Sequence, residues 1–328
     1  MLSISSMTGN GTVFQRGRPI VIMGTSTPLA IITVTHGTTQ IGESVVGKGG
    51  DFRISCTELP TGGPYDLQVS CGTDTATVTG VFVGDVWLVA GQSNPNKTLT
   101  TTLRESVRSF GSARPKMTFM YPETAPVYNY TREEWHRTGD VSRIGSVFAN
   151  TLNSATGIPI GIIRAAFPGA PIQKFYNSDA YNQENGGGVA WVRNMPADAL
   201  AMDWVYPFAG LSMKGVLWWQ GESNIPAHEY YAGHLQRLMA RWRLIFNRPD
   251  LYFAVIGLQN IVAEGDDYLP ADQAQLRTAQ RAVADADGNA VWIKTDDLTP
   301  TGDLHPPDDE VNSIAQRAAN AVRTRLYV

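Results

Sequence analysis

The chain has 328 residues, a length typical of about two domains or of one large α/β domain with an addition. Hydrophobic residues make up 43% of it and charged residues 17%, which is the profile of a globular protein and excludes a disordered or fibrous chain. The formal net charge is −4 and there is no basic block, so we expect no nucleic acid partner.

The sequence contains no apolar run that approaches the roughly 18 residues of a membrane span. Residues 1–10 also lack the basic and apolar regions of a secretory signal. We therefore expect no membrane partner, and a location either in the cytoplasm or on a virion that is released from the cell.

Residues 12–80 alternate between apolar and polar side chains with a period of two. Turn residues separate short stretches such as 20–24, 30–35 and 75–79, which predicts a series of strands. Strands at this spacing are typical of a small β-sandwich, and we predict such a domain over residues 1–82.

The two cysteines of the chain lie in this first part. Cys56 and Cys71 each fall on the apolar side of an alternating stretch, which favours two buried thiols over a disulfide. No CxxC pair, Walker A, complete GxGxxG or HExxH motif is present in the sequence, so we expect neither a metal nor a cofactor.

The pattern changes after residue 82 to short apolar runs without alternation, which are typical of strands buried on both faces. These runs are residues 85–90, 117–120, 159–163, 215–219, 251–256 and 290–293. Stretches of helical period lie between them, at residues 142–155, 229–246, 268–285 and 309–325. Strands that alternate with helices predict a parallel sheet covered on both faces, so we expect residues 83–328 to form an α/β domain.

Ligands of such a sheet bind beyond the carboxyl ends of its strands, so the residues after each run are the ones to examine. Residues 91–94 (GQSN) follow the first run, and residues 220–224 (QGESN) follow the run at 215–219. A turn of small residues, 168–170 (PGA), and the segment 303–307 (DLHPP) complete the set. A hydroxyl, backbone N–H groups, carboxylates and an imidazole are the parts needed for acyl transfer.

Two serines compete for the role of nucleophile in such a site. Ser93 and Ser223 have nearly the same setting, after an apolar run and before an asparagine, and each could equally cap a helix. No GxSxG motif is present, so the nucleophile elbow of the α/β-hydrolases is not supported. Of the histidines, His305 best fits a general base, because it follows the last run and has a carboxylate two residues before it. A surface-loop histidine is the alternative.

Longer blocks of the sequence resemble a known family. Residues 84–94 (GDVWLVAGQSN) and 214–224 (KGVLWWQGESN) are similar to the first and central blocks of the sialate O-acetylesterases, a family of SGNH (GDSL-like) hydrolases. Weaker matches extend this resemblance over nearly the whole chain, at residues 13–16, 59–65, 157–172, 276–280 and 303–307.

The resemblance implies a three-layer α/β/α hydrolase domain with a parallel sheet, preceded by a small all-β domain. It also implies a serine esterase that removes O-acetyl groups from a carbohydrate, either sialic acid or an acetylated polysaccharide such as a bacterial surface glycan. The mechanism would use a serine, a histidine and an acid.

The resemblance assigns roles to individual residues. Ser93 is implied as the nucleophile, and the oxyanion donors are implied to be its own N–H, the N–H of Gly169 and the side chain of Gln220. This chain departs from the family at Pro95, where Met is usual, and at residues 168–170, where Gly-Gly-Thr is usual. Pro95 removes an N–H and fixes φ near −65° in the turn that presents Ser93.

His305 is implied as the base. Asp303 is the favoured partner that orients it, because the Asp-Leu-His-Pro sequence matches the family. Glu222 is the alternative, because related carbohydrate esterases use the glutamate of this block as the triad acid.

Aromatic planes are the usual platform for sugar rings, so we expect substrate contacts from Tyr128, Tyr130 and Trp135, together with Asn94 beside the nucleophile. Trp218 and Trp219 should face opposite sides of a strand, which predicts that at least one belongs to the core.

A second hypothesis is a carbohydrate-binding or virion-associated module, such as part of a phage tail, that keeps the fold and has lost catalysis. It is the weaker hypothesis, because Ser93, Gly169, Gln220 and His305 are all present.

Overall fold

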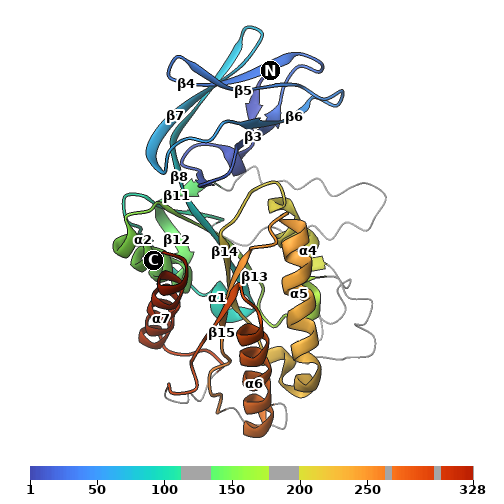
Figure 1. The fold of residues 1–328 in the computed structure, drawn as a ribbon, viewed down its shortest axis with the longest axis vertical. Coiled ribbons are helices and arrows are strands. Elements are labelled where there is room, and N and C mark those ends of the chain that lie inside the picture. Colours follow the sequence, from blue (N-terminus) through green and yellow to red (C-terminus); the bar gives the residue numbers. More distant parts are fainter. Residues whose placement is uncertain (112–133, 177–198, 263–267, 299–303, 328) are drawn as a thin grey trace.

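The computed structural model describes residues 1–111, 134–176, 199–262, 268–298 and 304–327, without the side chains of Met202 and Asp203. Figure 1 shows the N-terminal strands at one end of the molecule, with helices gathered around a second group of strands at the other. The architecture is a mixed α/β fold with one large mixed sheet.

The N-terminal strands share one apolar cluster, which the period-two alternation of the sequence predicts. Their bounds are β1 (Ser3–Ile4), β2 (Val13–Gln15), β3 (Ile20–Thr25), β4 (Ile31–His36), β5 (Thr39–Val45), β6 (Asp51–Cys56) and β7 (Gly62–Cys71). β1, β3 and β6 form one small sheet, whereas β4, β5 and β7 pair with one another and with β8, and residues of both groups belong to this cluster. Cys56 and Cys71 are buried free thiols within it, which confirms the prediction, and burial raises the pKa of Cys56 to about 11.

The longest strand, β8 (Asp74–Gly91), connects the two groups of strands. Its first half pairs antiparallel with β7, and its second half lies parallel to two strands of the central sheet. β8 therefore passes the predicted boundary between residues 82 and 83 without a loop. Gly84 permits the close approach of the neighbouring strand, because a Cβ there would lie 1.9 Å from the carbonyl oxygen of Pro159.

The central sheet has the strand order β10–β13–β8–β14–β15–β16, and every neighbouring pair is parallel. The bounds are β10 (Val107–Phe110), β13 (Ile160–Ala166), β14 (Gly215–Trp219), β15 (Tyr252–Ile256) and β16 (Ala290–Ile293). β11 (Trp135–His136) extends the sheet antiparallel to β10, and β9 (Thr98–Thr102) pairs with β12 (Thr138–Ser142). Five apolar runs are thus confirmed as strands, β10 was not predicted, and residues 117–120 lie outside the described residues.

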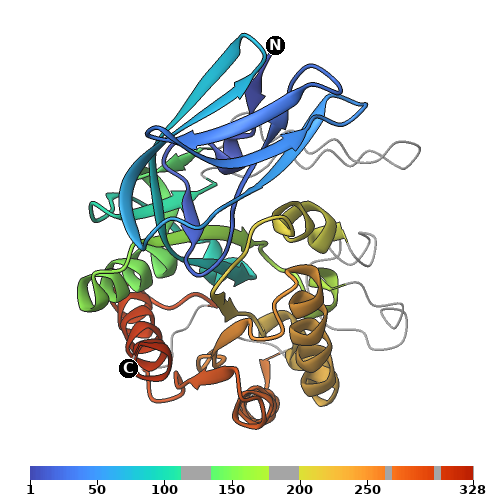
Figure 2. The same ribbon diagram turned by 45° about the horizontal axis from the view of Figure 1, so that its top comes forward.

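Helices pack on both faces of this sheet (Figures 1 and 2). α2 (Arg143–Thr156) and α7 (Asp308–Leu326) contribute to the apolar cluster on one face, and α5 (Tyr231–Ile245) and α6 (Pro270–Ala286) contribute to the cluster on the other. All four helices were predicted from the 3.6-residue period. Trp218 and Trp219 are both fully buried, one in each cluster, so both belong to the core.

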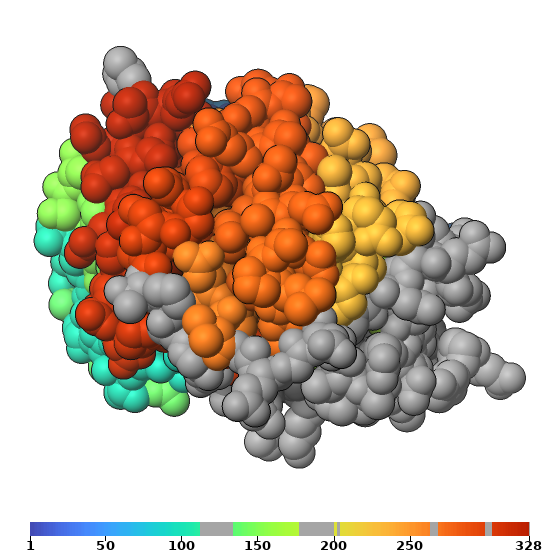
Figure 3. All heavy atoms as spheres, turned by 90° about the horizontal axis from the view of Figure 1, so that it is seen from below, coloured from blue at the N-terminus to red at the C-terminus, as the bar shows by residue number. Residues whose placement is uncertain are grey.

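Short helices complete the described elements. They are α1 (Ser93–Asn96), α4 (Ala199–Trp204) and the 3₁₀ segments η1 (Ser6–Thr8), η2 (Ile172–Phe175), η4 (Tyr206–Phe208) and η5 (Glu222–Tyr230). Figure 3 views the end opposite the N-terminal strands, where α5, α6 and α7 form much of the described surface in gold, orange and red. Within the described ranges, none of the helices combines the length and apolar character that crossing a membrane requires.

Candidate active site

Three adjacent strands end at the same level of the sheet. Gly91 at the end of β8 lies beside Ala166 of β13 on one side and Trp219 of β14 on the other. The order in which strands are added to the sheet reverses at β8. The next strands of the chain, β10 and β13, lie on one side of it, and the later strands β14, β15 and β16 lie on the other. Such a reversal opens a crevice at the carboxyl ends of the strands. Gly91 is required at this crowded point, since its φ is 136° and a Cβ would lie 1.8 Å from the carbonyl oxygen of Trp219.

Ser93 occupies the turn that follows Gly91 and begins α1. It is partly exposed, and in the described part of the chain neither its hydroxyl nor its backbone N–H donates a hydrogen bond. Ser223 differs, because it is only 7% exposed and its N–H donates to Gln92 Oε1 at 3.2 Å. The structure therefore separates the two serines that the sequence left equivalent.

Gly169 lies in the turn after β13, with a φ of 70°. This turn is fixed to the neighbouring strand ends, because the N–H of Phe167 donates to the carbonyl of Gly91 at 2.9 Å and Gln220 Nε2 donates to the carbonyl of Ala170 at 3.2 Å. Among the described residues, the N–H of Gly169 has no acceptor. Both backbone donors that were predicted for the oxyanion are thus uncommitted.

The side chain of Gln220 is fully buried and engaged. Its Nε2 lies 3.1 Å from Gln92 Oε1, 3.2 Å from the carbonyl of Ala170 and 2.7 Å from Asn224 Oδ1. Its Oε1 accepts a hydrogen bond from the Tyr231 hydroxyl at 3.0 Å. In this state the two amide hydrogens point at protein acceptors, so Gln220 ties the strand ends together.

The segment around His305 is held against the chain that follows Ser93. The carbonyl of Leu304 accepts hydrogen bonds from Asn94 Nδ2 at 3.4 Å and from Gln259 Nε2 at 2.9 Å. On the other side of His305, the carbonyl of Pro306 accepts from Lys97 Nζ at 3.1 Å. The backbone of the predicted base is therefore anchored on both sides, and two of its anchors come from the α1 region.

Glu222 lies between the same two amides and is only 3% exposed. Its Oε1 accepts from Asn94 Nδ2 at 2.6 Å and from Gln259 Nε2 at 3.3 Å. Its Oε2 is buried, and no described residue donates to it. Burial raises the pKa of Glu222, opposed by these hydrogen bonds. Within the described ranges, no hydrogen bond joins Glu222 to His305.

Gln92 and Gln259 also lie at this edge, and neither was predicted from the sequence as a site residue. Gln259 follows β15 as Glu222 follows β14, and its Oε1 accepts from the indole of Trp219 at 3.3 Å, which fixes the orientation of the amide. The rule of examining residues beyond each strand end would have found both glutamines.

Not every predicted site residue lies at this edge. Asp303, Tyr128 and Tyr130 fall outside the described residues. Trp135 is 6% exposed and belongs to the core, where its indole N–H donates to the carbonyl of Met7 at 3.0 Å, so its placement does not support a sugar contact. Asn94 is fully buried and acts on Glu222 and Leu304.

The amide network continues away from the strand ends. Asn224 Nδ2 donates to Gln173 Oε1 at 3.0 Å, and Gln173 Nε2 lies 3.2 Å from Nε2 of His234. His234 lies in α5 and is fully buried. Burial, with the charge of Arg237, lowers its pKa to about 4, so it is neutral at pH 7.

Metal ligands of the usual kind do not gather at this site. No group of three or more His, Cys, Asp or Glu side chains in the described ranges is placed to hold a metal ion. The chemistry that the arrangement offers is a hydroxyl beside uncommitted N–H groups and an anchored histidine segment.

Comparisons with known proteins agree with this chemistry. The family model described as "Carbohydrate esterase, sialic acid-specific acetylesterase" matches residues 83–324. The sialate O-acetylesterases of Pongo abelii and Homo sapiens are each 24% identical to this chain, over alignments that cover 98% of it and 71% of the relative. The crystal structure of a carbohydrate acetylesterase from Xanthomonas citri is 25% identical, with a TM-score of 0.85, and covers 100% of this chain and 76% of that one. Because the family model spans most of its length, the chain belongs to the sialic acid-specific acetylesterase family of carbohydrate esterases, which are carboxylic ester hydrolases.

Proposed function

We propose that this protein is a serine esterase that removes O-acetyl groups from a carbohydrate, on a three-layer SGNH-type hydrolase domain preceded by a small β-sandwich. The anchoring of the His305 segment carries this proposal. Leu304 is bound by Asn94, one residue after Ser93, and Pro306 is bound by Lys97, four residues after it. These bonds bring the backbone of a base to the turn that presents a partly exposed serine.

In the proposed mechanism, Ser93 Oγ attacks the carbonyl carbon of the acetyl group while His305 accepts the hydroxyl proton. The N–H groups of Ser93 and Gly169 stabilise the negative charge that develops on the carbonyl oxygen. The sugar oxygen leaves with the proton from His305. Water, activated by the same imidazole, then hydrolyses the acetyl-enzyme and releases acetate.

We propose Asp303 as the residue that orients His305. The partners of Glu222 support this choice, because one of its oxygens is already held by Asn94 and Gln259 and the other accepts nothing from a described residue. Glu222 instead holds the two amides that bind the carbonyl of Leu304, so we assign it a positioning role.

The substrate class comes from the family and its relatives. An acetyl group offers little apolar surface, so recognition must rest on the sugar to which it is attached. The relatives are sialate O-acetylesterases and a carbohydrate acetylesterase, and we therefore propose an O-acetylated sialic acid or an acetylated polysaccharide as the substrate.

The direct test is release of acetate from acetylated sialic acids, xylans and bacterial O-antigens. We expect wild-type protein to release acetate from one of these classes, Ser93→Ala to be inactive, and the control variant Ser223→Ala to keep most of the activity. His305→Ala should lower kcat by roughly 10³ or more. Equal losses in the two serine variants would overturn the assignment of the nucleophile.

The non-catalytic module is not favoured, because the family match and the uncommitted oxyanion donors both point to an enzyme. Hydrolysis of p-nitrophenyl acetate that depends on Ser93 would exclude it. Absence of any Ser93-dependent hydrolysis would favour it over the proposal.

A further inference from the structure

A second polar cleft lies at the amino ends of the central strands, opposite the edge that carries Ser93. It has a volume of about 440 Å³, and its lining includes Arg16, Arg18, Asp85, Lys214, Arg248 and Asp250. Asp85 begins the stretch of β8 that pairs with β13, and Lys214 and Asp250 precede β14 and β15. From Asp85 to Gly91 the strand rises roughly 20 Å, at about 3.3 Å per residue, so the cleft is separate from the proposed active site.

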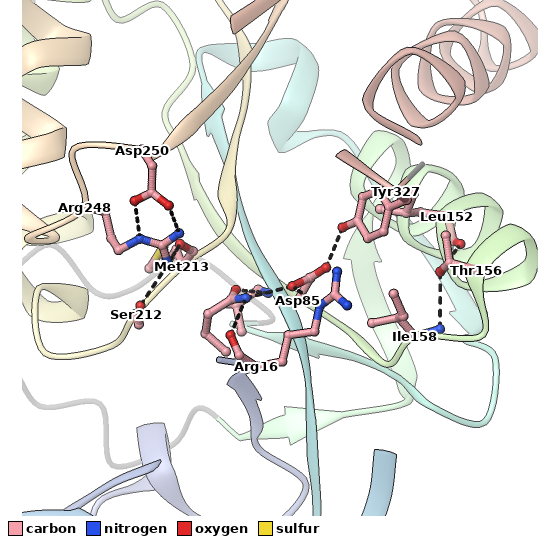
Figure 4. A network of polar contacts seen from close by, with 12 residues as sticks. Arg16, Asp85, Leu152, Thr156, Ile158, Ser212, Met213, Arg248, Asp250 and Tyr327 are labelled. Atoms are coloured by element: carbon pink, nitrogen blue, oxygen red, sulfur yellow. Dashed lines mark hydrogen bonds and ion pairs between the residues drawn. The ribbon is translucent and has the colours of Figure 1, made fainter. Parts of the chain in front are cut away.

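The floor of this cleft is an ion pair between buried Asp85 and partly exposed Arg16. Asp85 is fully buried, and its Oδ1 accepts from Gln15 Nε2 at 2.7 Å and from Arg16 Nε at 3.0 Å. Its Oδ2 accepts from the hydroxyl of Tyr327 at 2.6 Å (Figure 4). Both oxygens already accept hydrogen bonds from the protein, so we do not expect Asp85 to bind a cationic group of a ligand.

One wall is a second ion pair, between Arg248 and Asp250. Arg248 is 5% exposed and donates to both oxygens of Asp250, at 2.8 and 2.9 Å. Its Nη1 donates to the carbonyl of Met213 at 2.7 Å and to the Ser212 hydroxyl at 3.1 Å (Figure 4). A bidentate pair held by two further bonds keeps its geometry without a ligand.

Positive charge remains after these pairs are counted. The lining holds four cationic side chains against two carboxylates. Lys214 has no carboxylate within ion-pair distance in the described part of the chain, and Arg18 reaches Asp250 only at 3.9 Å. Arg16 uses its Nε on Asp85, and no described acceptor takes a hydrogen bond from its two Nη groups. The cleft thus presents cationic N–H donors that the described residues do not use, next to two ion pairs of fixed geometry.

We propose that this cleft is an accessory binding site for a carboxylate-bearing sugar, with the carboxylate held by Lys214, Arg18 and the Nη groups of Arg16. Guanidinium and ammonium groups are the usual partners of such an anion, and the ionised Asp250 can accept hydrogen bonds from sugar hydroxyls. The volume lies in the range of small-ligand sites. The choice of a sugar rests on the proposed function, whereas the anionic character rests on the lining alone.

Calorimetry on the Ser93→Ala protein tests this site without turnover. The probes are N-acetylneuraminic acid and its methyl ester, which differ in the carboxylate charge, together with inorganic phosphate. We expect the acid to bind at least tenfold more tightly than the ester. Lys214→Glu and Arg18→Glu should each weaken binding of the acid by tenfold or more, and Lys48→Glu, on a distant exposed turn, should leave it unchanged.

Three outcomes would overturn the proposal: equal binding of acid and ester, full affinity in the Lys214→Glu protein, or phosphate binding at this cleft as tight as the sugar acid. In the protein that retains Ser93, Lys214→Glu should leave the hydrolysis of p-nitrophenyl acetate unchanged. Binding and hydrolysis are measured separately, so a failure of the esterase proposal would not be mistaken for a failure of this one.

Discussion

Two buried carboxylates lie near opposite ends of the central strands and are satisfied in different ways. Among the described residues, Glu222, at the carboxyl end, has only the amides of Asn94 and Gln259 as side-chain partners, and one of its oxygens has no donor. Asp85, at the amino end, has a guanidinium, an amide and a phenol, and both of its oxygens are satisfied.

The difference separates two uses of a buried acid. A carboxylate paired with a cation joins parts of the chain, and Asp85 connects β2, β8 and the residue that follows α7. A carboxylate held by neutral amides orients them without bringing a second charge to the site. Glu222 does this for the amides that bind the carbonyl of Leu304, at the cost of a pKa raised by burial.

The largest effect that tests this comparison concerns the triad acid. Asp303→Asn should lower kcat by up to about 10⁴, because an amide in place of the orienting acid favours the wrong imidazole tautomer. Glu222→Gln should lower kcat by less than about tenfold, since Gln keeps an oxygen for the two amides. Both variants are to be measured on one acetylated substrate. The reverse order of the two losses would make Glu222 the triad acid and end the positioning assignment.

At the other end of the sheet, Asp85→Asn should destabilise the fold by about 3 kcal/mol, because it removes the charge that accepts hydrogen bonds from Gln15, Arg16 and Tyr327 at a buried position. Urea unfolding gives this value, and activity per folded molecule should be unchanged at low temperature. Tyr327→Phe removes only the phenol partner and should cost about 1 kcal/mol. A loss of kcat in folded Asp85→Asn protein would contradict the separation of the two ends.

Gln220→Ala distinguishes two roles for the amide between the strand ends. As an oxyanion donor, Gln220 would support kcat by about 10² to 10³ with little effect on KM. The hydrogen bonds to Gln92, Ala170 and Asn224 favour the structural role, so we expect a stability loss of about 2 kcal/mol and a smaller loss of kcat. Melting temperature and kcat measured on the same preparation separate these cases.

The smallest expected effect is a gain in stability, whereas the preceding variants lose stability or activity. The pKa of Glu222 is higher in the folded state than in the unfolded chain, so the unfolded chain releases this proton at lower pH. Between these two pKa values the folded state binds more protons, and its stability therefore falls as the pH rises. Glu222→Gln removes this dependence and should therefore raise the melting temperature at pH 8, with a smaller gain or none at pH 4.5. Melting curves over this range check it, and a stability deficit that grows with pH would refute it.

Much of the fold could be predicted because strands buried on both faces leave unbroken apolar runs, as at 215–219 for β14. The continuity of β8 could not, since Gly80 and Gly84 look like turn residues. Gly84 meets a packing requirement from Pro159, which lies 75 positions later in the chain. β9 is polar and rich in threonine, so it contains no apolar run that would predict a strand. Its pairing with β12, which lies about 40 residues later in the chain, could not be seen in the local sequence.

The positions of Ser93 and Glu222 just beyond strand ends could be predicted, because each closely follows an apolar run of the sequence. The hydrogen-bond partners of the buried amides could not be predicted, because they lie far away in the sequence, as Gln92 does from Gln220. Trp135 illustrates this limit. Its place beside a tyrosine-containing segment suggested a sugar contact, whereas its indole donates to the carbonyl of Met7, 128 residues away.

The continuity of β8 also has a mechanical consequence. Its extended backbone runs from the N-terminal strands to Gly91, two residues before Ser93, and it is bonded along its length to β7, β13 and β14. A pull applied at the N-terminal strands would load these ladders in shear, the direction in which many hydrogen bonds resist together. The N-terminal strands are therefore connected to the turn that carries Ser93 by one continuous, hydrogen-bonded strand, and a surface that held these strands would also set the orientation of that turn.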